Sequence, residues 1–378
     1  MNTRINRTAG LLLLFVPTLM RGQFSFSGSF STMFDDNIEN NALQVYDKIS
    51  RLSWEGGYLW DAERFQTRVA YEGELHYYGI DAARSFHVHE VSLTHSGQVD
   101  DDAHLLYEAG ASYGQRFGRE LFSFYDHRIA TGTAGISWTP AEFLRLKLGY
   151  TFRATSFREV PEYDYTEHVG ALRATIALPS RTTLIAGGEA GVKTLTPTVM
   201  TVESGSGNGR RFGNTETTVT LPGPATTQIT GSLRVGQSVF DGTGVSLTGM
   251  YRVNTGTAST TPSPEGTSDD DIFEDHYAYE GPSLSLMITQ IIGSRVTVRF
   301  IVDRQNRTYA DRPVYENDLL LFSGRADTRQ SATLLADYAI VPGGLTLSVI
   351  YDYIRNSSND PLYTYGNNAL TLGIHLPL

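Results

Sequence analysis

The 378-residue sequence contains no cysteine. A metal site built from thiolates is therefore excluded, and so is a lipid anchor on a cysteine that follows a leader peptide. Proteins of the cell envelope that meet an oxidising compartment are compatible with this composition. The absence of cysteine permits that location but does not identify it.

The sequence also lacks a long apolar run and an excess of positive charge. No stretch reaches the about 18 apolar residues of a membrane-spanning helix, so we expect no such helix. Lysine and arginine number 30 against 41 aspartates and glutamates, which gives a formal net charge of −11. Binding to nucleic-acid phosphates needs a basic surface, so this balance argues against a nucleic-acid partner.

The N-terminal segment has the three parts of a secretory signal peptide. Arg4 and Arg7 precede an apolar stretch that is too short to span a membrane, and the small residue Gly22 follows it. We predict cleavage after Gly22, so that residues 1–22 are the signal peptide and residues 23–378 are an exported mature chain. A buried N-terminal helix is the alternative interpretation.

Beyond the signal peptide, apolar and polar residues alternate in segments of strand length. Leu144, Leu146 and Leu148, for example, alternate with Arg145 and Lys147. Alternate side chains of a strand point to opposite faces, so each segment has one apolar and one polar face. Helical periodicity is almost absent, and we predict an all-β chain. Further clear segments are 24–31, 52–60, 245–254 and 296–302.

The connections between these segments alternate between short turns and long loops. Seven short and eight long connections join sixteen strands, an even number that places both ends of a barrel on one side. We expect short turns at 61–63, 100–103, 139–141, 179–181, 241–244, 293–294 and 342–344, and long loops at 35–46, 79–85, 117–124, 156–161, 196–224, 257–275, 307–322 and 356–361.

The last strand is apolar on one whole face. Leu370, Leu372, Ile374, Leu376 and Leu378 occupy every second position, with small or polar residues between them. A soluble chain rarely ends on an uncovered apolar face, although the edge strand of a soluble sandwich is an alternative. The final strand of an outer-membrane barrel closes the ring with this face in lipid.

In this respect the chain resembles the porin-like β-barrels of the Gram-negative outer membrane, although that class usually ends on an aromatic residue. The resemblance implies a transmembrane up-and-down antiparallel β-barrel of about sixteen strands with no plug domain. It also implies a location in the cell outer membrane. The expected partners are outer-membrane lipid, lipopolysaccharide and, through the C-terminal strand, the barrel-assembly machinery.

Strand parity predicts which charged side chains line the pore. The acidic group faces the basic group, as at the constriction of general diffusion porins, which this arrangement resembles. Such a transverse field would select solutes by charge. The alternative is that these charges only solvate the pore and pair with neighbours. The predicted lining residues are Glu55, Glu72, Glu74, Glu90 and Glu108 on the acidic strands, and Arg145, Lys147, Arg153, Arg173, Arg234, Arg252 and Arg299 on the basic strands.

Two long loops invite specific hypotheses. The Gly- and Ser-rich loop 196–224 is either a mobile surface loop or an inward-folding constriction of the pore. The loop 269–275 carries five carboxylates, which could hold Ca²⁺ through oxygen ligands. It lacks the spacing and turn glycine of an EF-hand, so a solvated acidic loop is the favoured interpretation. We therefore expect no metal and no cofactor.

The histidines give no catalytic or metal site in this interpretation. His87 and His89 share one strand face, whereas Glu90 points the other way, which argues against a shared metal. Ser92 and His95 also have opposite parity, so they do not form a local nucleophile–base pair. A Ser–His pair formed by distant residues stays open. We expect a protein that is not an enzyme.

A Pro-x-Tyr-x-Tyr motif occurs twice, at 161–165 and 361–365. Each copy follows a predicted ascending strand and precedes a descending one, which supports one repeating hairpin architecture. We place these tyrosines in the outer aromatic girdle, where their rings would lie among the lipid headgroups.

Two function classes remain. The first is a water-filled channel for passive diffusion of small hydrophilic solutes, and the second is a non-conducting surface barrel for adhesion, envelope assembly or export of a partner substrate. Small inward residues such as Ser25, Gly149 and Thr248 favour the channel. The solute and the oligomeric state are not determined by these patterns.

Overall fold

The computed structural model describes residues 21–204, 215–221, 223–255, 276–316 and 319–377. The first twenty residues of the predicted signal peptide and the acidic loop 269–275 lie outside the described residues. So does most of the Gly- and Ser-rich segment 204–211. Predictions about these three segments therefore stay predictions.

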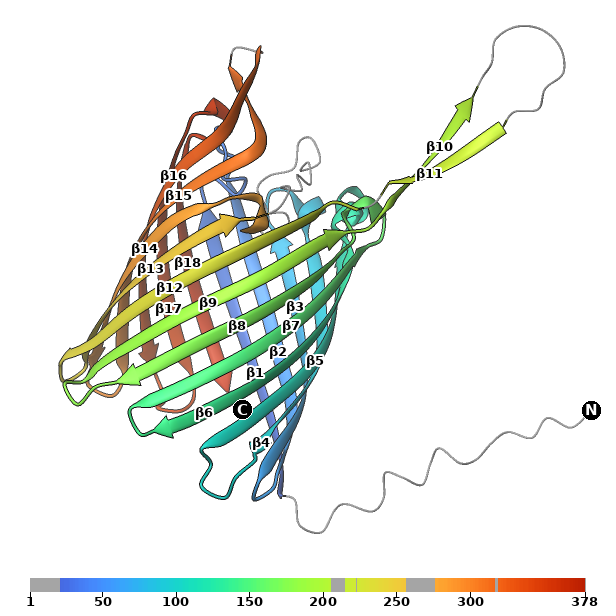
Figure 1. Cartoon of the computed structure of the whole chain (residues 1–378). Helices are drawn as coiled ribbons and strands as arrows, with labels where there is room; N and C mark the ends of the chain where they lie inside the picture. The colour runs from blue at the N-terminus through green and yellow to red at the C-terminus, as the bar shows by residue number, and fades with distance from the viewer. Residues whose placement is uncertain (1–20, 205–214, 222, 256–275, 317–318, 378) are drawn as a thin grey trace, which may run out of the picture.

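The described chain forms one closed ring of sixteen antiparallel strands, which confirms the predicted fold class (Figure 1). Each strand of the ring pairs with the next ring strand along the chain, and β1 closes the ring by pairing with β18. Closure satisfies the backbone hydrogen bonds of both outer strands, as a barrel in lipid requires. The ring consists of β1 (Arg21–Asp35), β2 (Asp47–Asp61), β3 (Phe65–Tyr78), β4 (Phe86–Gln98), β5 (Leu105–Gly118), β6 (His127–Ala141), β7 (Leu144–Phe157), β8 (Tyr165–Ala177), β9 (Thr182–Leu195), β12 (Ala225–Phe240), β13 (Thr243–Asn254), β14 (Gly281–Ile292), β15 (Val296–Glu316), β16 (Leu319–Ala339), β17 (Thr346–Ser358) and β18 (Tyr365–Pro377).

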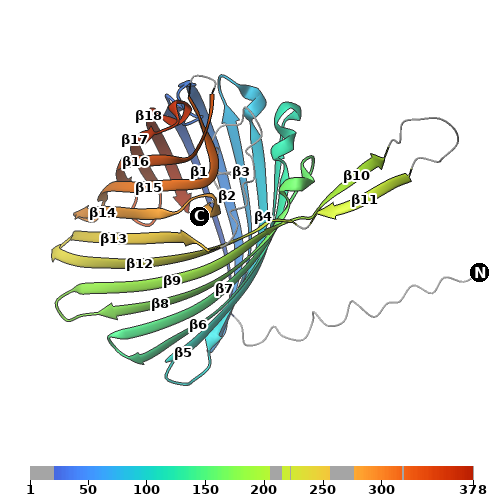
Figure 2. The same cartoon turned by 45° about the horizontal axis from the view of Figure 1, so that its top comes forward.

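The other two strands form a hairpin outside the ring. β10 (Thr198–Ser204) and β11 (Thr215–Leu221) pair only with each other, while β9 pairs directly with β12. Figures 1 and 2 show this hairpin projecting away from the barrel. The strands of the loop 196–224 therefore extend outward, and the inward-folding alternative does not describe them.

Short turns and long connections lie at opposite ends of the barrel, as the alternation predicts. The C-terminal end of β18 lies at the end with short turns (Figure 1). Within the described ranges, five short 3-10 helices occupy connections at the other end: η1 (Ala82–Arg84), η2 (Glu120–Tyr125), η3 (Pro161–Tyr163), η4 (His276–Ala278) and η5 (Pro361–Tyr363). No helix among the described residues has the length and hydropathy needed to cross a bilayer.

The outward face of the ring is apolar and exposed. Leu52, Leu75, Leu148 and Leu172 lie on this face with exposed fractions between 43% and 59%. Apolar side chains that find no cover within the chain have lipid as their natural environment, and the alternating sequence places them on one face. The opposite face of the same strands carries the predicted lining charges and therefore faces the lumen.

The predicted loop 307–322 is wrong in its secondary structure. β15 and β16 continue through this region as a paired hairpin, with register shifts between Tyr309 and Pro313 and between Pro313 and Val314. Proline cannot donate to a strand ladder, which is why the sequence indicated a loop there. The hairpin accommodates Pro313 at an irregular position and resumes pairing beyond it.

The placement of the repeated tyrosines in the outer girdle is also wrong. Both Pro-x-Tyr-x-Tyr copies form the same structure, a 3-10 turn in which the residue after the first tyrosine donates its N–H to the proline carbonyl. The ring centroid of Tyr165, however, lies 4.1 Å from Nζ of Lys193, on the inner face of the barrel. The exposed tyrosines of the outer-facing strand positions are instead Tyr58, Tyr71, Tyr77, Tyr113, Tyr150, Tyr251, Tyr338, Tyr351 and Tyr353.

Candidate functional site: the charged lumen and its inner strap

The strand registers place all twelve predicted lining residues on the inward face. On the acidic side, Glu55 of β2 faces Glu72 of β3, which in turn faces Glu90 of β4. These three carboxylates form one transverse row in which neighbouring side chains are about 5 Å apart at Cβ. Like charges in such a row repel, and this arrangement keeps a concentrated negative potential on the wall.

Only part of this acidic side is neutralised locally. Arg68 pairs with Glu55, and Arg51 pairs with Glu74. Among the described residues, Glu72 and Glu90 have no ion-pair partner. The alternative that lumen charges only pair with their neighbours therefore describes some of these residues. It does not describe Glu72 and Glu90, which leave a net negative charge on β3 and β4.

The basic side has the complementary character. Lys147 of β7 faces Arg173 of β8, and Arg145 lies on the same strand as Lys147. Arg145 and Arg173 are exposed and form no ion pair with any carboxylate that the structure describes. Lys147 reaches across β6 to Glu108 of β5, at 2.6 Å between Nζ and Oε1. This pair joins the edge of the acidic strands to the basic strands.

The exposed fractions of these inward ion pairs indicate whether packed side chains fill the interior of the barrel. The side chains of Lys147 and Glu108 are 41% and 52% exposed, and those of Arg68 and Glu55 are 42% and 34% exposed. Ion pairs inside a filled barrel would be buried, because packed side chains would exclude water. The few buried apolar residues among the described part of the chain are Ala70, Tyr125, Phe157, Leu195, Tyr277, Tyr279, Tyr309, Val314, Tyr365 and Ala369.

The strand order refines the predicted opposition of charges. In the ring of sixteen, β13 stands eight strands from β3, so Arg252 lies across the lumen from Glu72. β7 is only four strands from β3. Arg145 and Arg153 are therefore about a quarter of the way round from the acidic row and do not oppose it directly. Arg234 on β12 and Arg299 on β15 extend the positive charge over the intervening wall.

Three inward aspartates, Asp303, Asp337 and Asp352, lie across the lumen from β7 and its neighbours. β17 is eight strands from β7 and carries Asp352, while the adjoining strands β16 and β15 carry Asp337 and Asp303 at other register rows. Hydroxyl groups contact them, with Thr333 donating to Asp352 at 2.5 Å and Ser348 to Asp337 at 2.6 Å. Tyr351 and Tyr353 flank Asp352 on the outward face, and this Tyr-Asp-Tyr alternation was the sequence signal for it.

A segment of the β13–β14 connection lines the inner wall near the end with long connections. We call residues 276–280, which include η4, the inner strap. Within the strap Tyr277 is 3% exposed, and its hydroxyl donates to Oε1 of Glu167 on β8 at 3.0 Å. Glu167 also accepts a 2.6 Å ion-pair contact from Arg153 of β7. The strap is thus tied to the basic wall through a shared carboxylate.

Further contacts hold the strap to three other strands. Gln228 of β12 donates to the carbonyls of His276 at 2.6 Å and Tyr279 at 3.2 Å. The Tyr279 hydroxyl accepts from Arg252 of β13 at 3.0 Å and from Gln305 of β15 at 3.1 Å. Arg252, one of the predicted lining residues, therefore binds the strap in addition to lining the lumen.

Two glycines make the strap's path sterically feasible. Gly191 of β9 faces inward, and a Cβ there would lie 2.2 Å from the Tyr277 hydroxyl oxygen. Gly281, directly after the strap, has a φ of +135° and would place a Cβ 2.3 Å from the Asn306 carbonyl oxygen. Only glycine adopts this backbone conformation without strain, so it lets the chain turn from the strap into β14.

The opposite side of the same opening is built from the first loops. Arg84 of η1 pairs with Glu39 of the β1–β2 connection and with Asp81 at 3.3 Å. Arg116 of β5 is buried, with its guanidinium 4.1 Å from the Phe86 ring centroid and 3.8 Å from Asp126. These contacts fix η1 and η2 against the ends of β3 to β6.

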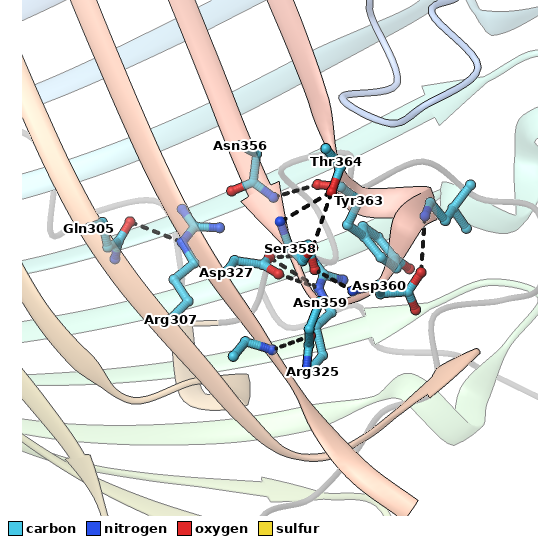
Figure 3. A network of polar contacts seen from close by, with 12 residues as sticks. Gln305, Arg307, Arg325, Asp327, Asn356, Ser358, Asn359, Asp360, Tyr363 and Thr364 are labelled. Atoms are coloured by element: carbon cyan, nitrogen blue, oxygen red, sulfur yellow. Dashed lines mark hydrogen bonds and ion pairs between the residues drawn. The ribbon is translucent and has the colours of Figure 1, made fainter. Parts of the chain in front are cut away.

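A third polar network fixes the ends of β15 to β18 (Figure 3). Arg325 and Asp327 of β16 form a buried pair, with exposed fractions of 2% and 4% and a shortest contact of 2.6 Å. The Arg325 guanidinium stacks 3.2 Å from the Tyr363 ring centroid of η5. Asn356 of β17 donates to the Tyr363 carbonyl at 2.6 Å. The repeated tyrosine motif therefore anchors a connection to the inner wall.

The histidines of β4 lie on its outward face, away from the lumen, whereas His76, His127 and His375 are on the inward faces of β3, β6 and β18. His87 and His89 are on the outward face of β4, where their ring nitrogens are 2.9 Å apart and the Tyr71 hydroxyl lies 2.7 Å from His89. Ser92 and His95 lie on opposite faces of β4, as parity predicts. Within the described ranges no group of three His, Cys, Asp or Glu residues has the geometry of a metal site.

The apolar outer face, the closed antiparallel ring and the charged inner face together define a β-barrel with a porin-like fold, in agreement with the fold that the resemblance implies. No protein-family model and no curated protein sequence matches this chain.

Solved structures of outer-membrane proteins are similar in fold. They include OpdL of Pseudomonas aeruginosa, with a TM-score of 0.53 and 8% identity over 94% of this chain and 98% of that one. OccAB3 of Acinetobacter baumannii gives 0.50 and 10% identity over 94% and 99%. The outer membrane protein OprD from Pseudomonas aeruginosa gives 0.50 and 11% identity over 95% and 94%. At these identities the similarity is evidence of the fold alone.

Proposed function

We propose that the protein is an outer-membrane channel for passive diffusion of small hydrophilic solutes and is not an enzyme. The observation that carries the proposal is the exposure of the inward ion pairs, above all Lys147–Glu108 with 41% and 52% exposed side chains. Charged groups that stay hydrated on the inner face of a sixteen-strand ring are the wall of an aqueous lumen.

The charge distribution supports selection of solutes by charge. The negative row Glu55–Glu72–Glu90 and the inward aspartates Asp303, Asp337 and Asp352 occupy one part of the ring. The unpaired arginines of β7 and β8 occupy another. A solute in the lumen meets a potential that changes sign across the pore, and wall charges determine which ions are enriched there.

The test is a planar-bilayer recording of the purified full-length mature protein. A water-filled channel gives steady steps of current that scale linearly with voltage. The second candidate, a non-conducting surface barrel, is favoured by one observation, the inner strap, which takes up part of the interior. Such a barrel would leave the bilayer closed.

We further propose that a signal peptide of residues 1–22 directs export, and that the C-terminal strand engages the barrel-assembly machinery. Arg21 and Gly22 pair with the last residues of β2, so cleavage after Gly22 would shorten only the free end of β1. Mass spectrometry of the membrane-inserted protein should find a chain that begins at Gln23 or within two residues of it. An intact Met1 would contradict export by this route.

A further inference from the structure

The outward faces of three neighbouring strands become polar at the same register row. On β15, β16 and β17 the last apolar row contains Val302, Ala332 and Tyr353. The next outward row, towards the end with long connections, contains Arg304, Gln330 and Arg355. All three of these side chains are exposed. The row therefore lies at the border of the lipid belt, where a bilayer has its headgroups.

The two arginines have no interaction partner within the described part of the protein. Within the described part of the chain neither Arg304 nor Arg355 forms an ion pair, a hydrogen bond or a stacking contact through its side chain. They flank Gln330 on adjacent strands, so their Cα atoms are about 10 Å apart, twice the spacing of neighbouring strands. Long side chains can converge on one anionic group from this distance.

A groove on the lipid-facing surface begins next to Arg304. Gly231 of β12 and Gly249 of β13 face outward and have no atom within 4 Å of a Cβ position, so they leave the surface hollow. Leu233, Tyr251 and Leu284 form the sides of the groove, and Arg304 with Asn306 closes its polar end. The groove has the amphipathic order of a lipid, apolar along its length and cationic at one end.

We propose that this surface binds a phosphorylated glycolipid of the outer leaflet, of the lipopolysaccharide class. Its phosphate would contact Arg304 and Arg355, and an acyl chain would occupy the groove at Gly231 and Gly249. The charge favours an anionic headgroup, since a planar guanidinium binds phosphate through paired hydrogen bonds. The location at the border distant from the C-terminal end of β18 selects the outer leaflet over the inner one.

The experiment is native mass spectrometry of the full mature protein in neutral detergent micelles, titrated with bisphosphorylated lipid A. We expect a bound glycolipid that survives detergent removal, and an apparent affinity reduced by about tenfold or more in the double variant Arg304→Gln/Arg355→Gln. The matched control is Arg128→Gln, because Arg128 is an exposed outward arginine at the corresponding border of β6. Unchanged binding by the double variant would overturn the proposal.

Two further arms identify the part of the lipid that is recognised. Dephosphorylated lipid A and phosphatidylglycerol should bind at least about tenfold more weakly. Equal binding by either lipid would overturn the assignment to a phosphorylated glycolipid. Gly249→Leu should also weaken binding by filling the groove, whereas Gly132→Leu, an equally uncrowded outward glycine on β6, should not. A dimer or trimer that buries the groove without lipid would contradict the proposal in a different way.

Discussion

The hydroxyl of Tyr277 donates a 3.0 Å hydrogen bond to Glu167, a residue 110 positions earlier in the chain. Glu167 is 4% exposed and is also the partner of Arg153. A carboxylate buried on a barrel wall needs such partners, because an unpaired buried charge is strongly unfavourable. The bond therefore ties the inner strap to the wall and keeps the strap at the side of the lumen.

Removal of this bond should loosen the strap. Tyr277→Phe leaves Glu167 with one donor fewer, at a cost of about 1–3 kcal/mol to local stability. We expect faster hydrogen exchange of residues 276–280 and larger open-channel noise, with an intact barrel. Tyr251→Phe on the outer face is the matched control, and equal exchange in both variants would show that the bond does not hold the strap.

Gly191→Ala should reproduce the effect of Tyr277→Phe by a steric route. The new Cβ would lie 2.2 Å from the Tyr277 hydroxyl oxygen, so the ring has to move away from Glu167. Gly149→Ala on the inward face of β7 meets no atom within 4 Å and should leave exchange in the strap unchanged. Protection of 276–280 that stays the same in Gly191→Ala would contradict the observed packing.

The charge of the lumen should determine ion preference. Reversal of Arg145 and Arg173 to Glu removes positive charge that no described carboxylate neutralises, so the ratio of cation to anion permeability should rise several-fold. These two residues are better targets than Arg153, whose reversal would place two carboxylates together at Glu167. Reversal potentials in a salt gradient measure the effect.

Arg128→Glu is the control for this charge reversal, because Arg128 is exposed on the outer face. It should leave the reversal potential unchanged. If the double reversal leaves conductance and selectivity unchanged, the hypothesis of charge selection in the lumen is contradicted. The proposal of an open channel is not affected by that result.

The face assignment of the last strand can be tested directly. Leu372 and Ile374 are 47% and 46% exposed on the outer face, whereas Thr371, directly before Leu372, faces the lumen. Leu372→Arg should destabilise the inserted barrel by about 2–4 kcal/mol, because the arginine meets lipid near the middle of the bilayer. Thr371→Arg should cost much less. Equal urea midpoints for the two variants in vesicles would contradict the assignment.

The fold was predictable from the sequence because every strand of a barrel has to meet the same structural requirement. Every strand must alternate, as 144–148 does, and the last strand must close the ring through an apolar face. The strand count follows from turn residues, which are local signals. The lining residues also follow from parity, which is why all twelve charged side chains lie on the inward face.

The errors arise where long-range contacts override local signals. Tyr165 and Tyr363 have the composition of a lipid girdle, yet cations that are distant in sequence, Lys193 and Arg325, bind their rings on the inner side. Pro313 indicated a loop, but a paired hairpin passes through it. The strap was not foreseen, because its partners Glu167 and Gln228 are far away in sequence.

The measurement that tests the central proposal most directly is single-channel recording of the refolded mature protein in a planar bilayer. The exposed ion pairs of the inner face predict steady ohmic steps at every polarity, with a conductance that increases with salt concentration. A closed membrane over the full range of voltage, pH and salt, from protein whose barrel is shown to be folded and inserted, would contradict an open aqueous lumen.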